Sequence, residues 1–137
     1  MTAISKAFSD VLSADVTLAG LLASYGGSPA VFTADPAPAD AVKPYVVTAG
    51  EAVHRPFDTK LTRGREIWRD VRCYANDTGS ADTIEQIAER VRALLHRQIF
   101  SIDGFSIEVA ECFGPIVADE PDAYGRVVTA RIIMMEV

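Results

Sequence analysis

The segment from Arg63 to Arg97 constrains the fold most, because it joins a strand pattern to a helix pattern through a short turn. Residues 65–75 alternate with the period of two that is typical of a β-strand. After turn-forming residues at 76–80, apolar side chains recur at helical spacing, with acidic residues early and basic residues late, as the helix dipole favours. A strand followed closely by an amphipathic helix predicts a sheet with that helix packed against it.

The strand at 65–75 has two faces of mixed polarity. One face carries Ile67, Arg69, Val71 and Cys73, and the other carries Glu66, Trp68, Asp70, Arg72 and Tyr74. Because neither face is purely apolar, we expect at least one of them to meet a partner or a covering segment. Two roles are open for Trp68, the single tryptophan: a place in the core, or an interface anchor of the kind that aromatic hot spots supply.

The rest of the chain completes an α+β pattern. Residues 2–22 predict two short helices, capped by Thr2 and Asp15. Further strands are expected at 31–33, 44–49, 105–113 and 126–137, and the last is apolar on both faces, as in the middle of a sheet. We therefore predict one α+β domain over residues 1–137, with a mostly antiparallel sheet of four to five strands packed by one long helix.

Three segments lack a regular pattern. Residues 50–65 are polar and interrupted by proline and glycine, which predicts a long hairpin arm between two antiparallel strands. Residues 111–125 predict an acidic loop with two prolines. Residues 35–44 contain three prolines and predict an extended connector. Irregular segments of this length usually carry function or contact a partner.

The charges of the chain are segregated. Residues 54–72 contain six basic and three acidic side chains, whereas residues 98–125 contain six acidic side chains and no basic one. Chance scatter over two solvated loops is one explanation. The other is that the basic loop of one subunit meets the acidic loop of its neighbour, a head-to-tail contact of the kind that closes into rings.

We accordingly predict a subunit interface with a basic and an acidic side. The predicted residues are Arg55, Arg63, Arg65 and Arg69 on the basic side, Asp119, Glu120 and Asp122 on the acidic side, and Trp68 beside them. The net charge of −6 argues against nucleic-acid binding by a broad basic surface. Four basic charges without interleaved aromatic residues are also a weak nucleic-acid signal.

The sequence contains no pattern that indicates catalysis, a metal or a cofactor. His54 and His96 lie far apart, and neither Cys-x-x-Cys nor His-Glu-x-x-His occurs. Cys73 is expected to be a buried thiol rather than a nucleophile. We also expect no signal peptide, because Lys6 and Asp10 interrupt the N-terminal apolar residues, and no membrane span.

The order of these elements resembles a known family. The features that support this resemblance are the leucine-rich helical start, the Pro-Tyr-Val-Val strand at 44–47, the Cys-Tyr-Ala end of the next strand at 73–75, the helix that follows, and the closing pair of strands. This pattern, over nearly the whole chain, is similar to the tail completion, or tail terminator, proteins of long-tailed phages, prophages and gene transfer agents.

That resemblance implies a structural virion protein, not an enzyme, made in the host bacterial cytoplasm and placed at the head-proximal end of the tail. It implies a six-membered ring that caps the major tail tube protein and meets the head-tail connector proteins, with DNA passing through the lumen. No binding residue is transferred from the family. The alternatives are a head-tail connector (neck) protein and, in another class, a small ligand-binding or enzymatic α+β domain with a discrete pocket.

Overall fold

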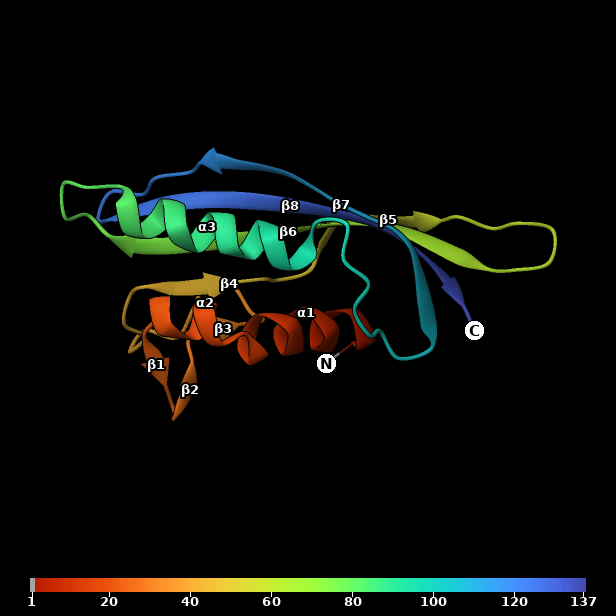
Figure 1. The fold of residues 1–137 in the computed structure, drawn as a ribbon, viewed down its shortest axis with the longest axis horizontal. Coiled ribbons are helices and arrows are strands. Elements are labelled where there is room, and N and C mark those ends of the chain that lie inside the picture. Colours follow the sequence, from red (N-terminus) through yellow and green to blue (C-terminus); the bar gives the residue numbers. More distant parts are fainter. Residues whose placement is uncertain (1) are drawn as a thin grey trace.

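The structure is a computed structural model that describes residues 2–137 as an α+β domain (Figure 1). The helices are α1 (Ala3–Ala14), α2 (Val16–Leu21) and α3 (Asp82–Leu95). The strands are β1 (Ser24–Tyr25), β2 (Ser28–Pro29), β3 (Val31–Phe32), β4 (Tyr45–Val47), β5 (Glu51–Pro56), β6 (Gly64–Asn76), β7 (Phe105–Val117) and β8 (Ala123–Glu136). The predicted α+β class is confirmed.

The main sheet has six strands, where four to five were expected. Its order is β3-β4-β6-β8-β7, and β5 pairs with β6 beside the end of β4. Among the described strands, β3 and β4 pair in parallel while the other pairs of this sheet are antiparallel, so the mostly antiparallel prediction is confirmed. Strands β1 and β2 form a separate two-stranded ribbon. The sheet is wider than predicted because the arm itself contributes a strand.

Strands β6 and β8 run the length of the molecule as one antiparallel pair, with 13 and 14 residues (Figure 1). One half of β6 pairs with β4 and the other half with β5, so both strands share one side of β6. The arm therefore leaves the sheet at one end of this pair, and the turn between β7 and β8 lies at the other end (Figure 1).

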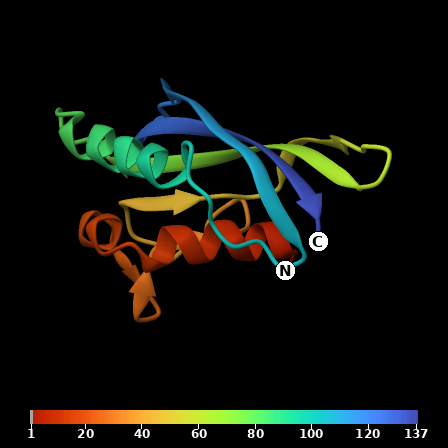
Figure 2. The ribbon, with the colours of Figure 1, turned by 45° about the vertical axis from the view of Figure 1, so that its right-hand side comes forward.

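The predicted hairpin arm is a β-hairpin with a register shift between Glu51 and Val53 and a short irregular tip. Strand β5 pairs with residues 65–69 of β6, and the amide of Phe57 donates to the carbonyl of Gly64 at 2.9 Å. Pro56 ends β5 on the sheet edge, where its missing N–H removes no ladder hydrogen bond. In both views the tip of the arm extends beyond the helices (Figures 1 and 2).

The predicted acidic loop at 111–125 is mostly strand, which corrects that prediction. Strand β7 continues to Val117 and β8 begins at Ala123, so a turn of residues 118–122 remains. The turn-forming Gly114 and Pro115 produce a break in register within β7. Gly114 has φ of 91°, and a Cβ there would meet a main-chain carbonyl at 2.8 Å, which explains the glycine.

The helices pack on one face of the sheet because each carries an apolar stripe. The caps of the N-terminal helices are confirmed: Thr2 Oγ1 accepts from the amide of Ser5 at 3.1 Å, and Asp15 accepts from the amide of Leu18 at 2.8 Å. The buried residues of α3 are Ile84, Ile87, Ala88, Val91 and Leu95. They share one apolar core with α1, α2 and the inward residues of β6, β7 and β8.

The opposite face of the sheet, which we call the helix-free face, carries the side chains of Glu66, Trp68, Asp70, Arg72 and Tyr74. At the β4 end it is covered by a small apolar cluster of Val47, Tyr74 and Ala123, against which Phe32, Ala37 and Tyr45 pack. Nearer the arm, Val53 and Phe113 remain 40% and 47% exposed. The prediction that one face of the strand at 65–75 meets a covering segment therefore holds at the β4 end, and near the arm it stays a prediction.

Candidate subunit interface

Arg69 lies in the core, which corrects its predicted place on the basic side of an interface. Its side chain is 0% exposed, on the β6 face that also carries Ile67 and Val71. Its Nε donates to Thr48 Oγ1 at 2.7 Å, and its Nη2 donates to the Thr48 carbonyl at 2.8 Å. A neighbouring subunit cannot reach this guanidinium without unfolding the site.

The remaining contacts of Arg69 join three segments. Its Nη1 pairs with Glu51 at 2.6 Å, and its Nη2 donates to Ser5 Oγ of α1 at 3.0 Å. The chain leaves the sheet between β4 and β5, and Arg69, the last residue of β6 that pairs with β5, supplies hydrogen-bond donors to Thr48 in that connection. Within the described chain no buried side-chain nitrogen or oxygen lacks a partner, so this buried charge is fully compensated.

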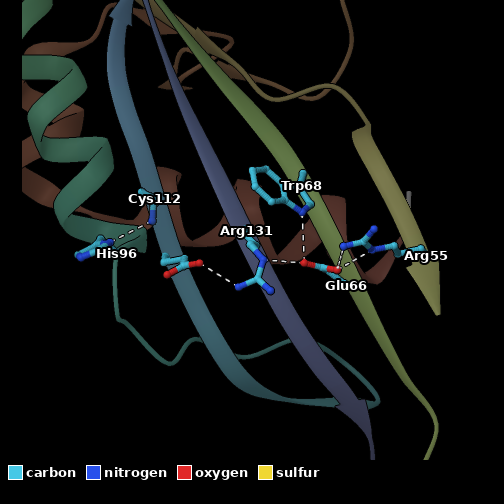
Figure 3. Close-up of polar contacts among 7 residues, drawn as sticks. Arg55, Glu66, Trp68, His96, Cys112 and Arg131 are labelled. Atoms are coloured by element: carbon cyan, nitrogen blue, oxygen red, sulfur yellow. Dashed lines mark hydrogen bonds and ion pairs between the residues drawn. The ribbon is translucent and has the colours of Figure 1, made fainter. Parts of the chain in front are cut away.

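A row of alternating charges crosses the helix-free face at the level of the arm (Figure 3). Glu66 of β6 accepts from the Nε atoms of Arg55 on β5 and Arg131 on β8, both at 2.6 Å. Arg131 Nη1 then donates to Glu111 on β7 at 2.9 Å. The order from one sheet edge to the other is therefore positive, negative, positive, negative.

Glu66 is the centre of this row. Its carboxylate is 3% exposed because the flanking side chains cover it. The hydrogen bonds from Arg55 and Arg131 hold the pKa of Glu66 below its ordinary value, against the opposing effect of burial. Trp68 Nε1 is a further, longer donor at 3.4 Å. The site therefore stays ionised at neutral pH.

The two ends of the row are incomplete. Arg55 binds one oxygen of Glu66 through Nε and Nη2, and its side chain is 64% exposed. Glu111 accepts from Arg131 through Oε1 and is 39% exposed. No residue among those described pairs with Arg55 Nη1 or Glu111 Oε2, so one sheet edge offers donors and the other an acceptor.

Trp68 lies on the helix-free face and not in the helix-covered core. Its ring stacks on Phe113 of β7, with centroids 5.4 Å apart and planes 5° apart. The guanidinium of Arg131 lies 6.0 Å from the Trp68 ring. The pair thus forms an aromatic surface next to the charge row, with Phe113 47% exposed.

The other predicted basic residues lie at the arm. Arg63 is exposed at the tip, and its side chain has no ion-pair partner within residues 2–137. Arg65 is half-buried, with its guanidinium 5.0 Å from the ring of Phe105. Lys60 is also exposed at the tip, so the basic character of this end comes from Lys60 and Arg63.

The predicted acidic residues lie in the β7–β8 turn at the opposite end of the molecule. Asp119 is occupied within the chain, because it accepts from the amide of Gly125 at 2.9 Å and pairs with Arg126 at 3.2 Å. Glu120 and Asp122 are exposed. The structure therefore separates the predicted basic and acidic residues within one chain and brings none of them together.

The row was missed because three of its members, Glu66, Arg131 and Glu111, come from strands far apart in sequence. The available signal was local: Glu66 shares the face of Trp68 in the alternation of β6. Pairing Glu66 with Arg131 required the β6–β8 register, in which Arg131 lies opposite Trp68. A sequence alone does not give that register.

The described residues offer neither an ionised thiol nor a cluster of metal ligands. Burial raises the pKa of Cys73 to about 12 and that of Cys112 to about 11, so both thiols are protonated at neutral pH. No group of three potential metal ligands occurs among residues 2–137. In the same residues, no helix has the length and apolar character needed to cross a bilayer.

Long paired strands, a charge row that is open at both edges and ends of opposite charge fit a structural protein that assembles with other chains. The chain belongs to the tail completion protein gp17 family, whose sequence model matches residues 6–134. The resemblance recognised from the sequence is confirmed, and the role of the protein is structural, in tail completion of a phage-type virion.

The fold is also similar to a solved structure. A chain in the virion of a native gene transfer agent particle superposes with a TM-score of 0.76 at 18% identity, covering 96% of this chain and 94% of that chain. At this identity the similarity concerns the fold. The search of curated proteins finds no match.

Proposed function

We propose that the protein is a tail terminator: six copies form a ring at the head-proximal end of the tail, cap the tail tube and join it to the head connector. The family membership supports the tail role. The observation that supports a joint is the polarity of the subunit, with a basic arm tip and an acidic turn at opposite ends of β6 and β8. A joint between two different structures needs chemically different ends.

In this proposal the ends of the sheet contact neighbouring proteins. Lys60 and Arg63 form the basic contact, and Glu120 and Asp122 form the acidic one, while Asp119 and Arg65 mainly order their own segments. DNA passes through the lumen without sequence-specific contacts. The match over residues 6–134 includes both ends, so both belong to the family domain.

The ring is tested by imaging the purified protein with negative-stain electron microscopy and weighing it by mass photometry. We expect closed rings of six subunits without any partner. A protein that stays monomeric at all concentrations, and forms rings only on a portal, is a connector instead. A monomer that forms no ring under either condition contradicts both assignments.

The charged ends are tested by charge reversal. Lys60→Glu with Arg63→Glu should weaken binding to purified tail tubes or connectors by at least about tenfold at low salt, and less at high salt. Lys6→Glu reverses one charge on α1, half the change of the arm variant, and serves as the control for charge reversal elsewhere on the surface. Unchanged binding of the arm variant to both partners would show that the arm tip is not a contact.

A further inference from the structure

We propose that the charge row continues from one subunit to the next: β5 of one copy docks beside β7 of its neighbour, and Arg55 pairs with the neighbour's Glu111. This inference rests on the proposed ring. It assigns the lateral contact of the ring to the two edges of the sheet. The arm tip and the acidic turn then remain available for contacts with the tail tube and the head connector on the two sides of the ring.

The charge order of the row carries the proposal. Each internal member has an oppositely charged neighbour on the next strand, at 2.6 to 2.9 Å. The row ends in Arg55 at one edge and Glu111 at the other, and each end retains an unused polar atom. A head-to-tail contact between identical chains joins a positive end to a negative end, and such a contact can close into a ring.

The β5 edge is open to a partner. Arg55 and Val53 lie opposite Glu66 and Trp68, and hydrogen bonds alternate along an antiparallel pair. The amide of Phe57 bonds toward β6, so the main-chain groups of His54 point away from it. Val53 is 40% exposed beside Arg55, which adds an apolar contact to the charge.

The β7 edge offers a matching groove. It has a volume of about 560 Å³ and lies between the segment after α3 and the first half of β7. Its lining residues are His96, Arg97, Gln98, Ile99, Ile107, Glu108, Val109, Ala110 and Glu111. Ile99 is 85% exposed and gives the groove an apolar wall. The groove therefore presents apolar surface, the carboxylates of Glu108 and Glu111 and the single cation of Arg97. The docking strand presents Val53 and Arg55 to it.

The groove also limits how the second copy docks. Cys112 donates its amide to His96 Nδ1 at 3.0 Å (Figure 3). The carbonyl of Ala110 accepts from the Arg97 amide at 2.7 Å. The outward main-chain groups of β7 are thus occupied at the level of Glu111. Side chains, not a continued ladder, make the contact there, which also protects this edge from unspecific strand pairing.

Cysteine cross-linking tests the contact. A chain with Arg55→Cys and Glu111→Cys, treated with a short bis-maleimide, should give a ladder of covalent oligomers up to the ring size, while each single variant gives no ladder. The native thiols are buried and serve as internal controls. The comparison pair Arg63→Cys with Asp122→Cys probes an end-to-end contact. Wild-type rings without a 55–111 ladder overturn this inference but leave the proposed function intact.

A conservative pair covers the case in which the cysteine variants assemble poorly. Arg55→Gln and Glu111→Gln should each raise the subunit concentration needed for half-maximal ring assembly by about tenfold at low salt. The double variant should be about as weak as either single one, because both remove the same pair. Fully additive effects, with unchanged circular dichroism, would contradict a direct contact between the two residues.

Discussion

Strand β6 carries one buried charged side chain on each face, and the two differ in where their partners lie. Arg69, on the helix side, has every partner inside its own chain: Thr48, Glu51 and Ser5. Glu66, on the helix-free side, is equally buried, but its row runs on to two exposed ends. One network is closed and the other is open.

The difference distinguishes a charge that stabilises the fold from a charge that, in the proposed ring, leads to a contact with another subunit. A closed network satisfies the buried groups and fixes the fold, and no further partner can be added to it. An open row leaves polar atoms at the sheet edges, where another molecule can complete them. Burial alone therefore does not identify a contact residue, because both charges are buried. In the proposed contact, the distinguishing feature is an unpaired polar atom at an exposed end of the network, such as Arg55 Nη1.

The largest effect is expected at the closed network. Arg69→Met keeps the side-chain length but leaves Glu51 and Thr48 without their donors, which should lower the free energy of unfolding by about 3 kcal/mol. Urea unfolding followed by Trp68 fluorescence measures the change. Arg72→Met, on the half-buried face of the same strand, should cost much less and is the control. A loss of under about 1 kcal/mol for Arg69→Met would place the closed network among the dispensable contacts.

The centre of the open row should respond to pH. The pKa of Glu66 is held down in the folded chain by Arg55 and Arg131, so its contribution is complete above the unfolded pKa and disappears as the pH falls through the folded pKa. Asp15, whose pKa is lowered by Arg90, adds the same dependence. Stability should therefore fall as the pH is lowered from about 4.5, the ordinary pKa of Glu66.

Glu66→Gln should lower stability at pH 7 by less than Arg69→Met and flatten the acid part of the curve. Thermal melting at several pH values between 2 and 7 measures both effects. Asp15→Asn is the second arm of the test, since it removes the other depressed carboxylate. A Glu66→Gln curve parallel to the wild-type curve would mean that the row adds no pH-dependent stability.

A smaller effect is expected where the open face is aromatic. Phe113→Leu removes the stacked ring beside Trp68 and should cost about 1 kcal/mol, with a red shift of the Trp68 emission as water reaches the indole. Ile116→Ala on the same strand, at a side chain that is 62% exposed, should change stability by less than about 0.5 kcal/mol. Equal effects at the two positions would show that the stack contributes nothing of its own.

The sequence predicted the elements whose signals are local. The alternation at 65–75, the stripe of α3 and the caps Thr2 and Asp15 all depend on residues within one or two turns of each other. The alternation also predicts the face on which Arg69 lies, because Arg69 is two residues from both Ile67 and Val71 and therefore shares their face of the strand. The segregated charge of residues 54–72 instead favours an interface position for Arg69, which the structure contradicts. The closed network shows that the strand alternation predicts the position of Arg69 better than the local charge does.

What the sequence could not predict depends on pairing between distant segments. Residues 51–56 of the arm form β5 because they pair with β6. Most of the predicted acidic loop forms strand because it pairs with β8 or belongs to it. The local pattern predicts neither outcome. In the acidic loop, Gly114 and Pro115 indicate a turn. The charge row needs the registers of three strand pairs at once, so it emerges only with the sheet.

The smallest effect is expected at the wall of the groove, where the open row ends. Arg97 has φ of 55°, in the left-handed region where glycine normally follows a helix, and its amide closes the β7 edge at Ala110. Arg97→Gly removes this strain but frees the unfolded chain, so we expect a net gain of about 0.5 kcal/mol in urea unfolding. Arg97→Ala removes the same side chain from the groove, so ring assembly should be equal in the two variants, because the closing hydrogen bond comes from the main chain. If Arg97→Gly instead weakened assembly while Arg97→Ala did not, the backbone of this turn would have to move when a neighbour docks, and the edge would belong to the open network as well.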